Sequence, residues 1–435
     1  MTFENINWGA LGIIVGVIAV IVAVLVPVWL HRLSGKQKRR DEKIATFNRL
    51  ENEFKQRTSS FDKLAYEYYK SESTHTLQEA NRLFYKPVWI HQPCDEIIKL
   101  SEIDITLEAA ANDFTKTNTR QRRFLRKICP DKDVDLIENM RRHLVPHRRL
   151  GNAPLFALNK FTVLREEGKR KKAELSVYVS DFPCYINTCR PFVYETIFEN
   201  IINNLQEPSR NSIRRQFALA DTKNRCVQIG VAVLTVLKNV TCRDQPGDET
   251  RRPMFLVLTR SDEVTTNPRM KDFVPAGCYE PMQTNLLKEG RLLDTEHLMT
   301  TVKREFLEEL CSERGAEVGD LRDFDVLKDR LHQSGLDEAF DNTYLLGAAF
   351  LPLQTHFDIF AVSVIDVKSI AIGQTAGEIL QWFTTNFEGT VDLIPFTRPY
   401  LNQYMQAADS TSGLQFAINI ILGDFENITT QLKIS

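Results

Sequence analysis

The chain has 435 residues, of which 43% are hydrophobic and 26% are charged. This balance argues against a disordered chain, a collagen-like repeat and a channel with many membrane spans. The formal net charge is −2, from 55 basic and 57 acidic side chains. A generally basic nucleic-acid-binding protein is therefore excluded, although a local basic patch is not. The length allows two or three domains, each with its own core.

The first apolar segment runs from Gly9 to Leu30 without a charged side chain. At about 1.5 Å per residue a helix of this length reaches roughly 33 Å, enough for a hydrocarbon core of about 30 Å. Trp8 and Trp29 lie at its two ends, where indole rings favour the membrane interface. The sequence therefore predicts a transmembrane helix over residues 9–30, in contact with membrane lipid. A cleaved signal peptide and a buried helix are the alternatives.

The charges on either side of this segment predict an orientation. Only Glu4 precedes it, whereas five basic residues follow it directly: Arg32, Lys36, Lys38, Arg39 and Arg40. The positive-inside rule then places residues 1–8 outside and the long C-terminal part in the cytoplasm, as a single-pass membrane protein. In that compartment the eight cysteines are expected to be reduced thiols.

Residues 31–70 combine the basic segment with an amphipathic helix. Aromatic residues recur in it every seven positions: Phe47, Phe54, Phe61 and Tyr68. A seven-residue period is typical of a short coiled coil, which would make the chain a homo-oligomer. However, Glu51 and Thr58 are polar at the alternate seam positions. We therefore favour packing of this helix on its own domain over self-association.

Residues 71–220 are predicted to be mainly helical, and their role is not indicated by any motif. They also contain a predicted strand from Leu175 and a helix near 194–204. Their basic runs could bind an anionic ligand, lipid or nucleic acid; these are residues 120–126, 141–149 and 165–172. Acidic residues nearby favour solvated helix faces instead, so nucleic acid is not the expected partner.

From Arg225 onward the sequence alternates between short apolar strands and helices. The predicted strands cover residues 227–237, 254–261, 272–281, 343–353 and 357–366, and the predicted helices cover 295–311 and 375–387. This order predicts an α/β or α+β sandwich. We assign it to a domain over residues 221–405, followed by a helical tail over 406–435.

The helix near residue 300 carries the most specific pattern in the chain. Glu305, Glu308 and Glu309 are spaced so that they share one helix face. Such a cluster of carboxylate oxygens is typical of a site for Mg²⁺ or Mn²⁺. Arg304 can pair with a neighbouring acidic residue and hold it in place. A solvated helix face is the simpler alternative for this pattern taken alone.

This segment resembles the Nudix hydrolase box, Gly-x5-Glu-x7-Arg-Glu-U-x-Glu-Glu-x-Gly-U, where U is a bulky aliphatic residue. The residues in register are Gly290, Glu296, Arg304, Glu305, Phe306, Leu307, Glu308, Glu309 and Leu310. Flanking segments also look like Nudix elements: Arg260–Ser261, Val274–Gly277 and Ile394–Thr397. The resemblance covers about residues 225–400 and does not extend to the first half of the chain.

Two positions depart from the family pattern. Cys311 stands where the second glycine of the box is expected, which puts the exit from the helix in doubt. The starting glycine has two candidates. Gly290 has the correct spacing, whereas Gly277 lies in a family-like Pro-x-Gly turn followed by Glu280. The Gly277 alternative requires an insertion before Glu296, since 18 residues separate the two instead of five.

The resemblance implies hydrolysis of a nucleoside diphosphate linked to another moiety, with Mg²⁺ or Mn²⁺ as cofactor. It implies that Glu305, Glu308 and Glu309 bind the metal, with Glu296 as a further acidic ligand and Arg304 orienting the carboxylates. Gly277, Glu280 and Gly290 would take part in cofactor binding, and the candidates for the general base are Glu280, Glu309 and Glu378.

Two other functions fit the same sequence. In the first, a catalytically weak Nudix domain senses a nucleotide and signals through the helical region to the membrane, as a nucleotide-signalling or antiviral effector would. In the second, the basic helical region makes the chain a scaffold for nucleic acid or lipid. A scaffold should bind anionic polymers with a steep dependence on salt.

Overall fold

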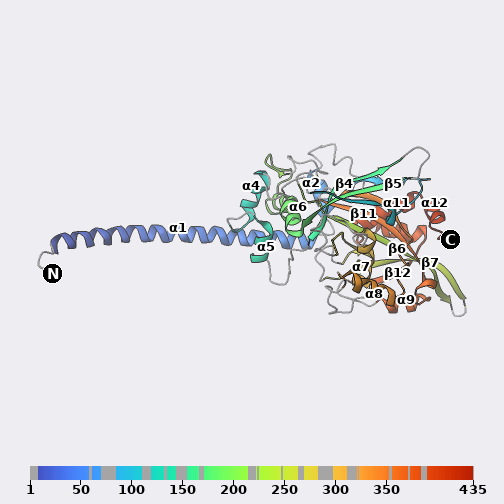
Figure 1. The fold of residues 1–435 in the computed structure, drawn as a ribbon. Coiled ribbons are helices and arrows are strands. Elements are labelled where there is room, and N and C mark those ends of the chain that lie inside the picture. The colour runs from blue at the N-terminus through green and yellow to red at the C-terminus, as the bar shows by residue number, and fades with distance from the viewer. Residues whose placement is uncertain are drawn as a thin grey trace.

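The protein is described here by a computed structural model. It describes residues 8–57, 61–69, 85–109, 119–131, 135–143, 154–165, 171–213, 222, 225–245, 248–262, 269–282, 297–310, 321, 323–351, 355–370, 373–383 and 389–434. Within these ranges the architecture is mixed α/β, with a nine-stranded and a three-stranded sheet. A long N-terminal helix projects from the body of the molecule (Figure 1).

The large sheet is built around two long central strands. Its strand order is β1 (Lys86–Ile90), β10 (Thr343–Leu351), β11 (His356–Asp366), β6 (Ile229–Gln245), β7 (Asp248–Arg260) and β12 (Gly389–Pro395). Three short strands pair alongside: β2 (Ile98–Lys99) with β10, β8 (Lys271–Asp272) with β7, and β9 (Ala276–Cys278) with β6. The β11–β6 pair is parallel, whereas the other strand pairs of this sheet are antiparallel.

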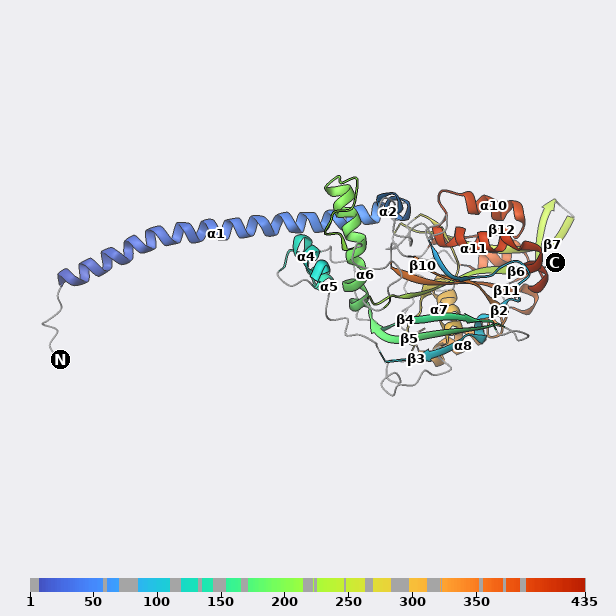
Figure 2. The ribbon, with the colours of Figure 1, turned by 90° about the horizontal axis from the view of Figure 1, so that it is seen from above.

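Both faces of this sheet are buried. Successive side chains of a strand point to opposite faces, so Val231 and Val233 of β6 join one core while Ala232 and Leu234 join another. The second core is covered by three C-terminal helices, α10 (Arg398–Gln406), α11 (Ser412–Gly423) and α12 (Phe425–Gln431). Figure 2 shows α10 and α11 above the sheet.

The opposite face is covered by helices and by the small sheet. The helices are α7 (Leu298–Leu310), α8 (Phe324–Gln333) and α9 (Ala376–Trp382). The small sheet has the order β3 (Asp104–Leu107), β5 (Lys172–Asp181) and β4 (Pro154–Leu164). In Figure 2, α7 and α8 lie on the same side of the large sheet as β3, β4 and β5. The polar edge of α7 faces β9, and this arrangement positions the acidic residues discussed below.

A helical end adjoins the two sheets. It contains α1 (Trp8–Arg57), α2 (Phe61–Tyr69), α4 (Thr119–Ile128), α5 (Leu136–His143) and α6 (Phe182–Thr196), which continues as a turn of π-helix over Ile197–Ile202. The aromatic stripe with a period of seven is buried in the core of this end; its members are Phe47, Phe54, Phe61 and Tyr68. The stripe of α1 and α2 therefore packs within its own chain.

The basic runs make ion pairs with nearby acidic residues. Arg142 of α5 lies 3.2 Å from Asp131 and 2.9 Å from Glu138. Lys171, just before β5, lies 2.5 Å from Asp95. The pairs of Arg142 are largely exposed and contribute little stability, since water screens the charges, whereas the side chains of Lys171 and Asp95 are only 10% and 9% exposed.

The expected fold class is wrong in its mainly helical region: the described residues of 71–220 form strands as well as helices. β1 belongs to the large sheet, and β4 and β5 form an antiparallel pair with residues 172–181 as one partner. Along β4, Leu155 and Ala157 join the core of the helical end, whereas Phe156 and Leu158 join the core around α7. A strand that is buried on both faces lacks the alternation of apolar and polar residues by which strands are recognised.

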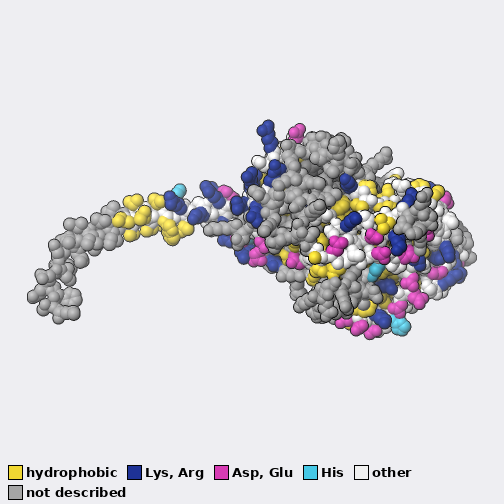
Figure 3. All heavy atoms as spheres, turned by 45° about the horizontal axis from the view of Figure 1, so that its top comes forward, with side chains coloured by type: hydrophobic (Ala, Val, Ile, Leu, Met, Phe, Trp, Pro, Cys, Tyr) yellow, Lys and Arg dark blue, Asp and Glu magenta, His cyan; other side chains and the backbone are white. Residues whose placement is uncertain are grey.

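The expected transmembrane helix over residues 9–30 is also corrected. Within the described part of the chain, no helix combines the length and apolar character that a membrane crossing requires. The described side chains of α1 begin at Ile21, and the apolar run ends at Leu30, before Arg32. Figure 3 shows this run as a hydrophobic section of the projecting helix, next to Lys and Arg side chains.

Candidate functional site

The site is built on α7, whose apolar side anchors it beneath the large sheet. Val302, Phe306 and Leu310 are spaced by four residues and are buried in the core. The ring of Phe306 meets those of Phe340 and Phe383 edge-on, at centroid distances of 4.9 and 6.1 Å. Fixing this side of α7 directs its acidic residues toward β9.

Arg304 occupies the centre of the polar side of α7 and is only 2% exposed. Its Nη2 donates a hydrogen bond to Oε1 of Glu305 at 2.5 Å and to the carbonyl oxygen of Cys278 at 3.4 Å. Its Nε lies 3.7 Å from Oε1 of Glu308. Burial opposes the positive charge, but the carboxylates of Glu305 and Glu308 outweigh it and raise the pKa of Arg304. The guanidinium therefore links α7 to β9.

The other contacts between α7 and β9 come from carboxylates. A side chain at position 277 would overlap the carboxylate of Glu305, so only glycine permits this approach. Oε2 of Glu309 accepts a hydrogen bond from the main-chain N–H of Ala276 at 3.1 Å, and Glu309 is only 5% exposed. Ala276 of β9 thus holds Glu309, and Gly277 leaves room for Glu305.

Glu280 lies just beyond β9, and its carboxylate interacts electrostatically with Arg304 and Cys278. Its carboxylate contributes to the raised pKa of Arg304. Burial raises the pKa of the Cys278 thiol, and the charges of Glu280 and Glu305 raise it further. The negative charges of Glu280, Glu305 and Glu308 therefore surround one buried arginine.

The other predicted residues are placed differently. Glu378 belongs to a capping box at the start of α9, where its Oε2 accepts hydrogen bonds from the N–H groups of Gln374 and Thr375. This contact gives Glu378 a structural role in holding the helix terminus. Gly290, Glu296 and Cys311 lie outside the described residues. Of the two candidate starting glycines, Gly277 is the one described, and it lies against Glu305.

The donor chemistry of this site suits a hard divalent cation, since carboxylate oxygens are the ligands that Mg²⁺ prefers. The present placement of the side chains is different from a formed metal site. Across the described ranges, no group of three or more His, Cys, Asp or Glu side chains is positioned to hold a metal ion. Glu305 instead contacts Arg304, and Glu309 contacts the amide of Ala276.

Sequence reasoning missed the main-chain partners of these residues. The N–H of Ala276 and the carbonyl of Cys278 carry no side-chain signal, although the Val-Pro-Ala-Gly run marked the correct segment. It also missed Lys303 and Lys328, which line a cavity on the other side of α7. Each of these lysines stands in an ordinary charged helix face, so their convergence depends on how α7 and α8 pack.

Comparison with known proteins identifies no family. The chain matches no family model and no curated protein. One solved structure that it matches is described as the crystal structure of a NUDIX hydrolase from Alicyclobacillus acidocaldarius. That match has 16% sequence identity and a TM-score of 0.29, and it covers 50% of this chain and 100% of the other. A likeness of this size is too weak to carry an argument about fold or activity.

Proposed function

We propose that the region over residues 225–400 is a Nudix-type hydrolase, which cleaves a nucleoside diphosphate linked to another moiety and uses Mg²⁺ or Mn²⁺. The observation that carries this proposal is the contact between the carboxylate of Glu305 and Gly277, with Arg304 joined to the same carboxylate. Arg304 and Glu305 match the family motif in type and register, whereas Gly277 matches it only with an insertion before Glu296. Their contacts join α7 to β9, two segments that the family resemblance also expects to be adjacent.

In this proposal, each contact of α7 has a separate task. Arg304 fixes the side chain of Glu305 and, through the Cys278 carbonyl, the distance between α7 and β9. The amide of Ala276 orients Glu309. A divalent cation held by Glu305, Glu308 and Glu309 would neutralise the diphosphate and activate the attacking water. Glu280 and Glu309 remain the candidates for the base that accepts the proton of this water.

Product analysis tests this proposal. The full chain is incubated with Mg²⁺ or Mn²⁺ and a panel containing dinucleoside polyphosphates, ADP-ribose and sugar nucleotides, and the products are separated by chromatography. We expect a nucleoside monophosphate as one product, no product in the presence of EDTA, and no product from the Glu308→Gln/Glu309→Gln double variant. Turnover that persists in the double variant would contradict the assignment of these residues.

A nucleotide sensor is the second candidate, and one observation favours it. Glu305 and Glu309 are held by contacts within the chain, and the described residues lack a formed metal-binding group. A domain in this state could bind a nucleotide without cleaving it. The sensing domain would then communicate with the helical end through contacts such as that between Tyr185 of α6 and His356 of β11.

Thermal unfolding distinguishes the two candidates. A ligand that binds the folded state raises the melting temperature whether or not it is cleaved. A rise with one member of the panel, without any product from that compound, would favour the sensor over the hydrolase. Product formation that requires metal and the glutamates would favour the hydrolase.

A further inference from the structure

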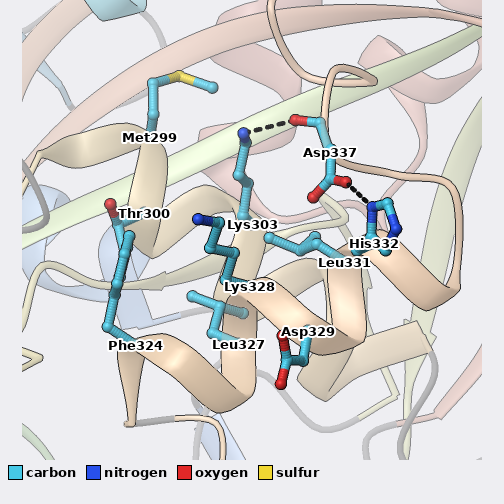
Figure 4. A pocket seen from close by; sticks show the side chains of 10 residues that line it. All are labelled: Met299, Thr300, Lys303, Phe324, Leu327, Lys328, Asp329, Leu331, His332 and Asp337. Carbon is cyan, nitrogen blue, oxygen red and sulfur yellow. Dashed lines mark hydrogen bonds and ion pairs between the residues drawn. The ribbon is translucent and has the colours of Figure 1, made fainter.

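A cavity of about 610 Å³ lies between α7 and α8. Its apolar wall includes Met299 of α7 and three residues of α8, which are Phe324, Leu327 and Leu331. Two lysines, Lys303 and Lys328, also line it. Figure 4 shows the side chains of both lysines between the two helices. A volume of this size is within the range of pockets for small organic ligands, which is about 300–1,000 Å³.

This cavity is separate from the acidic site. Successive residues of a helix are offset by about 100°, so Met299, Thr300 and Lys303 point roughly opposite to Glu305, Glu308 and Glu309. α7 therefore has two functional sides, one facing β9 and one facing α8. A ligand in the cavity would not contact the glutamates of the proposed hydrolase.

The ammonium group of Lys303 is hydrogen-bonded to an uncharged main-chain carbonyl group. Its Nζ donates a hydrogen bond to the main-chain oxygen of Asp337 at 2.7 Å. The carboxylate of Asp337 is instead paired with the imidazole of His332, at 2.9 Å. Lys303 is half-buried, and Lys328 approaches the cavity from the exposed side of α8. The carboxylate of Asp329 also lines the cavity. Two ammonium groups beside an apolar wall can still attract a ligand that brings a negative charge, because hydrogen bonds between charged groups are stronger than neutral ones.

The apolar wall specifies the other part of such a ligand. Leu327 and Leu331 are 1% and 5% exposed, so they form a fixed base between the helices. Phe324 and Met299 flank this base, and aromatic and thioether side chains both pack well against flat rings. An inorganic anion would leave this wall in water, and a neutral ring would make no ionic contact with either lysine.

We propose that the cavity between α7 and α8 binds a small amphipathic anion, with a phosphate or carboxylate head on an aromatic body. The head lies between Lys303 and Lys328, and the body packs on Phe324, Leu327 and Leu331. This binding site is independent of the proposed hydrolase reaction, since it uses none of the glutamates of α7.

A matched series of compounds tests both parts of the ligand by isothermal titration calorimetry on the full chain without metal. The probes are 1-naphthyl phosphate, 1-naphthoate, 1-naphthol and inorganic phosphate. We expect at least one of the two charged naphthyl compounds to bind at least about tenfold more tightly than both 1-naphthol and inorganic phosphate. The tighter of the two identifies the preferred head. Equal binding of 1-naphthol, or no binding of either anion, would overturn the proposal.

Two variants place the binding in this cavity. Lys303→Gln/Lys328→Gln removes both charges and should weaken the tighter anion at least about tenfold, whereas Lys127→Gln on the exposed side of α4 should not change it. Met299→Trp fills the cavity and keeps both lysines, and should also abolish binding. Unchanged affinity in either of these two cavity variants would show that the anion binds elsewhere and would refute the proposed site.

Discussion

The carboxylate of Glu305 on α7 occupies the space that a side chain at position 277 of β9 would require. The two residues are distant in sequence, and their contact joins the acidic helix to the strand turn. It also accounts for a glycine at 277, because any larger residue there would overlap the carboxylate. Mutations at these two positions should therefore affect stability and activity, and the two effects can be measured separately.

Gly277→Ala should displace the Glu305 carboxylate from Arg304 and lower the unfolding free energy by about 1 kcal/mol. The displaced group is the end of a long side chain, so the backbone need not move. In a Glu305→Ala background the same substitution should cost much less, because the overlapping atoms are absent. Chemical denaturation of the four proteins of this cycle measures the difference.

Gly377→Ala in α9 is the matched control, because a side chain there meets nothing within 4 Å. It should be neutral or stabilising by up to about 1 kcal/mol, since alanine favours helix over glycine. Equal costs for Gly277→Ala in both backgrounds would contradict the contact with Glu305.

Arg304→Met should lower the unfolding free energy by about 3–5 kcal/mol, because it leaves the carboxylates of Glu305 and Glu308 without their buried positive partner. Adding Glu308→Gln should recover part of this loss by removing one of the two charges. Denaturation by urea at neutral pH measures both effects. Arg142→Met removes an exposed arginine that also contacts two acidic residues, and should change stability little. If Arg304→Met lowered the unfolding free energy as little as Arg142→Met, the proposed network of buried charges would be contradicted.

The half-buried His356 of β11 should make stability depend on pH. Burial, and then the positive charge of Arg190, lower the pKa of His356 from 6.5 to about 4. Between these values the unfolded chain binds a proton that the folded chain does not, so stability is full above about pH 6.5 and declines as the pH falls toward 4. The loss should be about 1–3 kcal/mol, with allowance for partial exposure.

His356→Gln should remove this part of the pH dependence, leaving the decline that the carboxylates cause in both proteins. His332→Gln is the control, since His332 is exposed. Unfolding free energies at several pH values between 4 and 7 provide the comparison. Identical slopes for the wild type and His356→Gln would refute the lowered pKa.

Glu378 should act in helix capping and not in catalysis. Glu378→Gln should preserve both activity and stability, because glutamine also completes a capping box. Glu378→Ala should lower the unfolding free energy by about 0.5–1 kcal/mol while leaving turnover unchanged. Steady-state kinetics and thermal denaturation of the two variants test this. Loss of turnover in Glu378→Gln would restore Glu378 as a candidate base.

The sequence predicted the central elements well because their signals are local. The apolar runs at 227–237 and 357–366 correspond to β6 and β11, and the helix expected at 295–311 is observed as Leu298–Leu310. Short apolar runs bounded by polar loops indicate strands, and spacings of three and four indicate a helix.

The features that could not be predicted from the sequence depend on contacts between residues far apart in the chain. β1 joins the large sheet beside β10, more than 250 residues later in the chain, and nothing within residues 86–90 indicates that partner. β4 packs on two cores through opposite faces, so its pattern lacks the usual alternation. In the site, the spacing of glutamates was readable from the sequence, but the main-chain contacts of Ala276 and Cys278 depend on where β9 lies against α7.

The most direct test of the proposed active site is the rate of metal-dependent hydrolysis by Glu305→Gln, measured with the best substrate of the panel and compared with the wild type. Glu426→Gln is the control, since Glu426 is exposed and pairs with Arg398 on the opposite face of the sheet. We expect Glu305→Gln to lower kcat/KM by roughly 100-fold or more and Glu426→Gln to leave it unchanged. Hydrolysis by Glu305→Gln at the wild-type rate would contradict the proposed active site.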